Sequence, residues 1–393
     1  MQTIEFLSPW YFATAYHLFF LIISWITVLY YVGSNQQKIL HSEGSPMQGM
    51  ALLLTIAVTI FLGLRPNNRV FGDMGLYRHT YNNVLYEYSS FSLNKEWIWD
   101  NLMYFFKSSG FSANEFFLFV DIGYFGGMFI CAMLLMRRNI WIAVLFFYTS
   151  FSSYSYGTNG IRNGLSCSME LVAIALLTME KTKHVVAYLI LFLSFGIHRS
   201  SILPAAAVIG SLYFIKDTKT AIRFWLISIA ISLVAGPLVE QFFAALGFDD
   251  RMSSYSSANQ DEEAASQFSK TGFRWDFLMY SGFGVAMVWY VTRYRRFTDR
   301  AYMIIANTYI LCNAFWVMVI RSSFSNRFAY LSWFLYPVVM AYPLLRMNLW
   351  KDQDRKTSLI FFLYSGFTFF MFFVFYFGTS NGFQGFNQYW WLD

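Results

Sequence analysis

The chain has 393 residues, of which 57% are hydrophobic, 22% aromatic and only 13% charged, and its formal net charge is +6 at pH 7. Together with a mean hydropathy of +0.42, this composition excludes a soluble protein folded around one aqueous core. The positive charge lies mainly in short loops between apolar runs, so it does not indicate a nucleic-acid partner. We therefore expect the lipid bilayer to surround a single integral membrane domain, residues 1–393.

Apolar runs of about 17 to 22 residues, enough to cross the bilayer core as a helix, recur along the chain. They predict an all-α, polytopic transmembrane bundle of about twelve spans. The spans are expected at 10–32, 48–64, 116–136, 140–157, 162–179, 185–198, 200–215, 221–240, 274–292, 301–320, 328–345 and 358–378. The sixth and seventh are short and meet at His198, so 185–215 is either a tight hairpin or one broken helix. In both cases the backbone near His198 must line a cavity within the protein.

Lys and Arg residues are unevenly divided between the alternate loops. The larger share lies in one set, at Lys38, Arg137, Arg138, Lys181, Lys183, Lys216, Lys219, Arg223, Arg293, Arg295, Arg296, Arg300, Arg346, Lys351, Arg355 and Lys356. Because cytoplasmic loops are enriched in these residues, we expect this set to face the cytoplasm. Both termini are then outside, and the start of the chain does not resemble a cleaved signal peptide.

Two of the expected outer loops are long. Residues 65–115 are rich in Tyr, Trp and Asn and contain both signs of charge, which suits sugars because aromatic faces stack on them while amides and carboxylates pair with their hydroxyls. The alternative is an aromatic belt at the membrane interface. Residues 241–273 are polar, locally acidic and rich in Ser, and form either a lid over an outer cavity or a solvated connector.

Four arginines are expected at the outer ends of the spans. Arg162 and Arg199 each open a predicted helix, and Arg321 and Arg327 bracket a short turn. The helix dipole disfavours a cation at a helix N-terminus, whereas a bound anion is favoured by both the dipole and the guanidinium. A diphosphate is the ligand we expect, since guanidinium groups bind phosphate oxygens in pairs. The alternative role is anchoring to lipid headgroups.

His198 and Asp73 are the candidate catalytic residues. His198 precedes Arg199, whose charge disfavours the imidazolium, so a neutral ring could act as a general base for a sugar hydroxyl. A hydrogen-bonded structural histidine is the alternative. Asp73 begins the stretch DMGLYRHTY just beyond the second span. It either orients or activates a sugar, or it pairs with Arg69 or Arg78.

The sequence contains no pattern typical of a metal site. Cys131, Cys167 and Cys312 lie singly within apolar runs, and the histidines lack the spacing of zinc ligands. We therefore expect no metal and no other cofactor.

The order of these motifs resembles the EpsG-like family of bacterial exopolysaccharide polymerases, which are related in role to Wzy-type O-antigen polymerases. Family members show an Arg-Gln pair where this chain has Arg162 and Asn163, and a His followed by a basic or small residue and Ser at His198. The matching segments are Asp73 with Tyr77 and Tyr81, IRNGLSCSMELVAIALL, KTK, LSFGIHRSSILPAA, and SNRFAYLSW with Arg327 and Tyr330.

The resemblance implies a glycosyltransferase-C-like membrane enzyme that joins repeat units carried on undecaprenyl diphosphate, as in O-antigen, lipopolysaccharide or exopolysaccharide synthesis. It places the active site on the periplasmic or exterior side of the bacterial plasma (inner) membrane, with a chain-length regulator protein as a partner. The resemblance assigns diphosphate binding to Arg162, Arg199, Arg321 and Arg327, catalysis to His198 and Asp73, and sugar binding to Tyr77, Tyr81, Asn163 and Tyr330. The alternatives are a lipid-linked oligosaccharide flippase and a polyprenyl-phosphate-dependent glycosyltransferase.

Overall fold

The computed structural model describes residues 3–33, 47–87, 91, 93, 96–179, 181–245, 273–322 and 325–376. Every regular element in these ranges is helical, so the prediction of an all-α fold is confirmed. Among the described residues, six helices are long and apolar enough to cross a membrane, and the chain is a multi-pass membrane protein. They are Pro9–Val32, Ala113–Tyr148, Thr218–Gln241, Arg300–Met318, Arg327–Arg346 and Gln353–Phe373, with Gln48–Gly63 as a shorter apolar helix.

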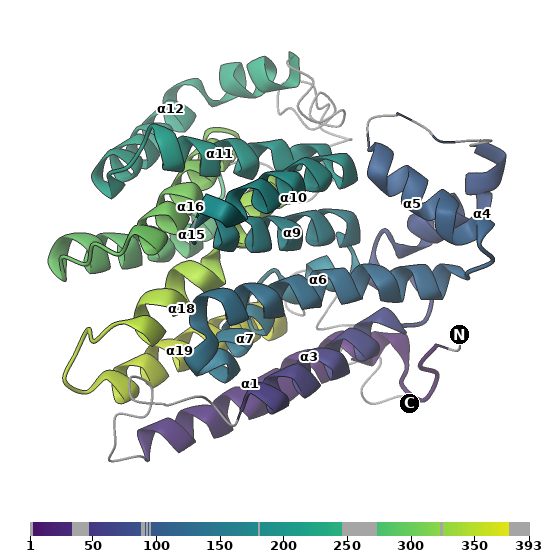
Figure 1. Ribbon diagram of the computed structural model, residues 1–393, viewed down its shortest axis with the longest axis horizontal. Helices are drawn as coiled ribbons and strands as arrows, with labels where there is room; N and C mark the ends of the chain where they lie inside the picture. The colour runs from purple at the N-terminus through teal and green to yellow at the C-terminus, as the bar shows by residue number, and fades with distance from the viewer. Residues whose placement is uncertain are drawn as a thin grey trace.

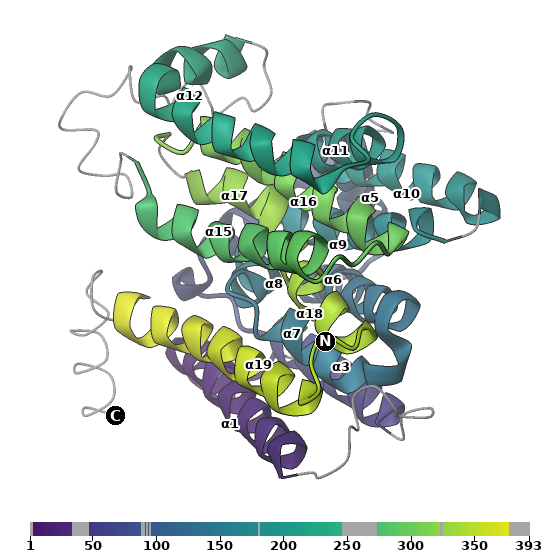
Figure 2. The same ribbon diagram turned by 90° about the vertical axis from the view of Figure 1, so that its left-hand side faces the viewer.

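The first half of the chain forms a layer of long helices that run along the longest dimension of the molecule (Figure 1). α3 (Gln48–Gly63) packs on α6 (Ala113–Met136), and α7 (Ile140–Tyr148) continues from α6 into the centre of the bundle. α1 (Phe12–Val32) lies beside α19 (Gln353–Phe370), so the two ends of the described chain meet at one side of the bundle (Figure 2).

The second layer is formed by helices from the middle of the chain. α9 (Ile161–Leu177) packs between α6 and α10 (His184–Ile197), while α11 (Ile202–Tyr213) and α12 (Thr218–Ala245) cover α16 (Arg300–Met318). α16 and α18 (Tyr336–Arg346) are buried along most of their length, as expected for helices surrounded by other helices. The remaining helices of this layer are α8 (Ser153–Thr158), α15 (Trp275–Trp289) and α17 (Ser325–Trp333).

The expected outer segment 65–115 contains two helices, α4 (Met74–Glu87) and α5 (Trp97–Ser108), which pack on each other at one end of the bundle (Figure 1). The spacing of its apolar residues explains why α5 forms. Trp99 and Met103 are one helical turn apart and only 1% exposed, and the Trp99 ring meets Phe116 of α6 at 5.2 Å. The aromatic residues of this segment therefore pack α4 and α5 against α6.

The chain breaks at His198, whose backbone is extended between α10 and α11 with φ −148° and ψ 117°. A short 3-10 helix, Arg199–Ser201, then leads into α11. Residues 185–215 are therefore two short helices that meet at His198. In the predicted outer segment 241–273, residues 246–272, on which the lid prediction depends, lie outside the described residues.

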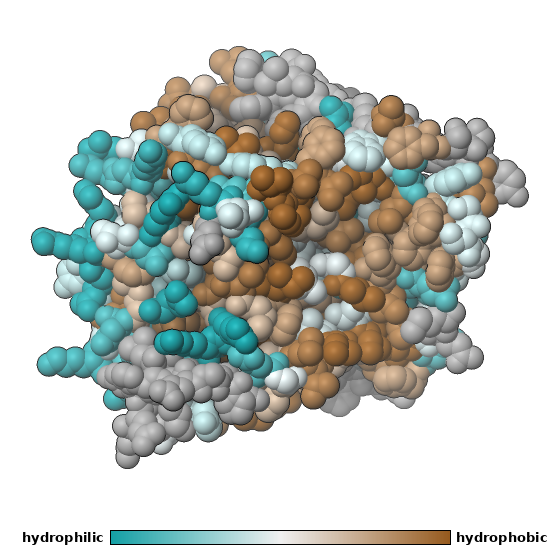
Figure 3. Space-filling model, viewed as in Figure 1, coloured by the Kyte–Doolittle hydropathy of each residue, from teal (hydrophilic) through white to brown (hydrophobic). Residues whose placement is uncertain are grey.

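The two ends of the bundle differ in polarity. Hydrophilic side chains gather along the left edge of the molecule in Figure 3, where α15 and α18 end in Figure 1. Arg137, Arg138, Arg293, Arg295 and Arg346 are exposed at the helix ends and connections predicted to face the cytoplasm. α4, α5 and the break at His198 lie toward the other end, where the candidate site residues are.

Candidate functional site

Glu96 joins two of the predicted site residues. It immediately precedes α5, and its Oε1 lies 2.8 Å from Nδ1 of His198, while its Oε2 forms an ion pair with Nη1 of Arg162. The side chains of Arg162, Glu96 and His198 are 21%, 18% and 17% exposed, so the group is partly buried but still accessible. We refer to these three residues as the Glu96 cluster.

Ionisation of Glu96 determines how His198 is held. Burial is the largest influence and would raise the pKa of the Glu96 carboxyl, but the hydrogen bond from His198, the charge of Arg162 and the backbone amide of Arg199 together outweigh it and hold the pKa below its usual range. The carboxylate is therefore ionised at neutral pH and can only accept hydrogen bonds. Nδ1 of His198 must then carry the shared hydrogen, so Nε2 is the ring nitrogen that can accept a proton when the ring is neutral.

The backbone around His198 is fixed by serines. The amide of His198 donates to the carbonyl of Ser194 at 3.0 Å, and the hydroxyl of Ser166 donates to the same carbonyl at 3.1 Å. The hydroxyl of Ser194 lies 3.4 Å from that of Ser201 across the break. These hydrogen bonds at the break are thus made within the protein.

Asp73 forms a second group with Arg327 of α17. Its Oδ2 lies 3.7 Å from Nη2 of Arg327, and its amide donates to Oδ1 of Asn159 at 2.8 Å. The preceding Gly72 has φ +64°, and a Cβ there would lie 2.5 Å from Oδ1 of Asn159, so glycine is required at this turn. Among the alternatives raised by the sequence, the side chain of Arg78 is directed instead to Asn114.

Two tyrosines connect the Glu96 cluster to the Asp73 group. Nδ2 of Asn163, next to Arg162, donates to the hydroxyl of Tyr156 at 3.3 Å, and the ring of Tyr156 lies 4.3 Å from that of Tyr330 on α17. Tyr330 is one helical turn after Arg327. The structure therefore assembles Arg162, Asn163, Tyr330, Arg327 and Asp73, from three separate segments, in one region.

The remaining predicted residues lie in other surroundings. Tyr81 is fully buried, donates its hydroxyl to the carbonyl of Phe111 at 2.8 Å and stacks on Phe116, so it supports α4 rather than presenting a face to a sugar. Tyr77 is half-buried, with its ring 5.9 Å from that of Trp99. Arg321 packs against α12, with its guanidinium carbon 5.7 Å from the ring of Phe273.

Glu96 was not identified from the sequence. It stands among aromatic residues in SLNKEWIWD, and its only signal is a carboxylate placed directly before an amphipathic helix. A local signal of that kind does not predict that Glu96 meets His198, because the two are 102 residues apart in the chain. The contact depends on how α5 packs against α10.

A buried ion pair was also not predicted. Nη1 of Arg65 lies 2.7 Å from Oδ2 of Asp121, with both side chains at most 1% exposed, and it also donates to the carbonyl of Leu62 at 2.6 Å. The pair joins the residue that follows α3 to α6. Within the described ranges, no group of three or more His, Cys, Asp or Glu residues could hold a metal ion.

Comparison with known proteins adds a family relationship. A family model described as the EpsG family matches residues 50–391, which include the Glu96 cluster and the Asp73 group. No curated protein and no solved structure matches the chain.

Proposed function

The chain belongs to the EpsG family, whose membership suggests a role in exopolysaccharide biosynthesis, and from this premise we propose that it is a metal-independent, lipid-linked repeat-unit polymerase. It transfers a growing glycan from undecaprenyl diphosphate to the non-reducing end of an incoming lipid-linked unit at the outer face of the plasma membrane. The observation that carries this proposal is the Glu96 cluster, in which a carboxylate orients a histidine beside an arginine.

The reaction needs a base for the acceptor hydroxyl. The hydroxyl oxygen attacks the anomeric carbon of the growing chain, its proton passes to Nε2 of His198, and the bond from the anomeric carbon to the diphosphate oxygen breaks with its electron pair leaving on undecaprenyl diphosphate. Glu96 holds the ring by Nδ1 and stabilises the imidazolium that forms. Asp73 orients the sugar from the neighbouring group.

Negative charge grows on the departing diphosphate, and the arginines are placed to stabilise it. Nε of Arg162 has no hydrogen-bond partner among the described residues, and the side chain is 21% exposed, so the guanidinium group is accessible to a ligand. Arg327 forms an ion pair with Asp73, with 3.7 Å between Nη2 and Oδ2, and its side chain is 36% exposed, so phosphate can reach the guanidinium. Arg199 and Arg321 assist as the further cations of this end.

Helix length supports a site below the membrane surface. α10 has 14 residues and α11 has 12, which at 1.5 Å per residue gives about 21 and 18 Å, less than the roughly 30 Å hydrocarbon core. In the proposed topology of about twelve spans, with both termini outside, His198 is then reached through a cavity from the outer face. Tyr77, Asn163 and Tyr330 contact sugar there, and a chain-length regulator protein is a further partner.

The test is to supply the purified protein, in vesicles, with a lipid-linked repeat unit and no nucleotide sugar. A ladder of products of increasing length is expected. A single added sugar that requires a polyprenyl-phosphate donor would indicate a glycosyltransferase instead, and movement of the substrate across the bilayer without bond formation would indicate a flippase.

A further inference from the structure

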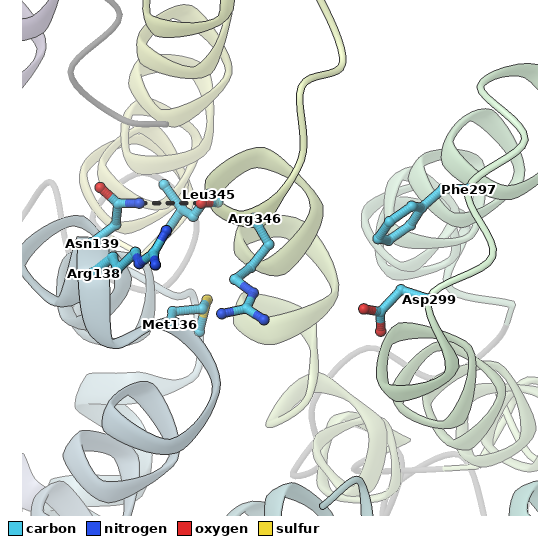
Figure 4. A pocket seen from close by; sticks show the side chains of 7 residues that line it. All are labelled: Met136, Arg138, Asn139, Phe297, Asp299, Leu345 and Arg346. Carbon is cyan, nitrogen blue, oxygen red and sulfur yellow. Dashed lines mark hydrogen bonds between the residues drawn. The ribbon is translucent and has the colours of Figure 1, made fainter. Parts of the chain in front are cut away.

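A pocket of about 340 Å³ lies at the cation-rich end of the bundle, where α6, α16 and α18 end or begin. It is lined by Met136, Arg138, Asn139, Phe297, Asp299, Leu345 and Arg346. Figure 4 shows Arg138 and Arg346 on neighbouring elements of the pocket wall and Asp299 with Phe297 on the opposite wall. None of these residues belongs to the Glu96 cluster or the Asp73 group.

The walls of the pocket are held by specific contacts. Nδ2 of Asn139 donates to the carbonyl of Leu345 at 3.1 Å, which fixes the short helix that carries Arg138 to the end of α18. The guanidinium carbon of Arg346 lies 5.8 Å from the ring centroid of Tyr342. The two arginines are therefore presented from elements that are joined to each other.

The lining carries two arginines and one acidic residue, Asp299, whose carboxylate also holds the start of α16. Its Oδ1 accepts from the amide of Tyr302 at 2.9 Å, where it caps α16, and from the hydroxyl of Tyr342 at 3.2 Å. The flanking charges, Arg137 beside Arg138 and Arg300 beside Asp299, are also cations. The field in the pocket is therefore positive.

We propose that this pocket binds the phosphate group of an anionic phospholipid from the adjacent leaflet. Two guanidinium groups on one wall can hold phosphate oxygens in pairs. Met136, Phe297 and Leu345 form an apolar part of the lining. This part can contact the glycerol and first methylenes of a lipid, whereas free phosphate has no apolar group to contact it. The volume of about 340 Å³ holds a headgroup and leaves the acyl chains outside.

A lipid bound there would connect the end of α6, the end of α18 and the start of α16, three elements that are far apart in the chain. Binding should therefore stabilise the folded protein against unfolding. This inference does not depend on the proposed polymerase activity, because it concerns the other end of the molecule.

The test measures thermal unfolding of the full chain in detergent with phosphatidylglycerol, with phosphatidylcholine, or with inorganic phosphate. Phosphatidylglycerol alone should raise the unfolding temperature. The variant Arg138→Gln/Arg346→Gln should weaken this response by roughly tenfold or more in lipid concentration. The matched variant Arg295→Gln/Arg355→Gln removes the same charge from exposed positions and should respond as the wild type does.

Equal responses of the two double variants would overturn the proposal, because the effect would then be due to net charge. Equal protection by phosphatidylcholine would overturn the preference for an anionic lipid. Equal protection by inorganic phosphate would overturn the assignment to a lipid, because the pocket would then bind the phosphate ion alone. If the double variant does not fold, Arg346→Lys serves in its place, since it keeps the charge but loses the paired donors. It should bind phosphatidylglycerol, counted by native mass spectrometry, less well than the wild type does.

Discussion

Nδ1 of His198 lies 2.8 Å from Oε1 of Glu96, although the two residues are 102 positions apart in the chain. The contact changes what His198 can do. The ionised carboxylate fixes the hydrogen on Nδ1, so Nε2 is the ring nitrogen that can act as a base. Each prediction about the candidate site below depends on this geometry or on the arginines around it.

His198→Ala should abolish polymer formation while the protein still binds the lipid-linked substrate. In the proposed mechanism the imidazole acts on the acceptor hydroxyl in the transition state, so its loss should lower kcat by about 10²- to 10⁴-fold. Turnover and substrate binding are measured separately on the purified protein. Retention of more than about a tenth of the rate would return His198 to a structural role, and loss of binding would assign it to the diphosphate site or to the helix break.

Glu96→Gln should lower turnover and remove a pH dependence of stability. The folded-state pKa of Glu96 is below its ordinary value, so the ionised cluster stabilises the fold fully above the ordinary pKa, near 4.3, and this stabilisation disappears as the pH falls through the folded-state pKa. The unfolding temperatures of wild type and Glu96→Gln, measured from pH 7 downward, should therefore converge in acid. Curves that stay parallel would show that the carboxylate is not ionised in the fold.

Arg162→Lys and Arg327→Lys should each lose most of the polymerising activity without unfolding the protein. Lys keeps the charge but lacks the planar group that binds two phosphate oxygens. Arg355→Lys, at an exposed position of α19, is the matched control and should be active. Product ladders of normal length from both site variants would argue for headgroup anchors rather than diphosphate ligands.

Asp121→Asn should destabilise the protein by about 3–5 kcal/mol, because it leaves the guanidinium of Arg65 buried without its counter-charge. The double variant Arg65→Met/Asp121→Leu should be less destabilised than either single change, Asp121→Asn or Arg65→Met, since apolar side chains need no partner. Free energies of unfolding of the three variants in detergent give the comparison. A double variant that is the least stable of the three would mean that the pair is needed for more than charge balance.

The proposed orientation can be tested with single introduced cysteines. A cysteine at Ser109, exposed at the end of α5, should react with an impermeant thiol reagent added from outside, and one at Thr182 should not. Cys131, Cys167 and Cys312 are buried and should give little background. The reverse labelling pattern would place the candidate site on the cytoplasmic side.

Apolar run length was sufficient to predict an all-α membrane protein, because the bilayer imposes a period and a length on each helix. The break at His198 was also predicted, as two short runs that abut. The contacts between the candidate site residues were not predicted. Arg162 and His198 meet through Glu96, and Asp73 meets Arg327, because α5, α9, α10 and α17 pack at one end of the bundle. Such contacts depend on packing between distant segments, which a single sequence does not record.

The ion pair between Asp73 and Arg327 can form only late in the synthesis and membrane insertion of the chain. Asp73 is made early and belongs to the segment that caps the helix ends, whereas Arg327 is near the end of the described chain. A ribosome that has delivered Asp73 to the membrane must still make α9 through α16 before α17 can emerge. The complete group of candidate site residues therefore cannot exist in a partly synthesised chain, and it forms only after α17 has been inserted.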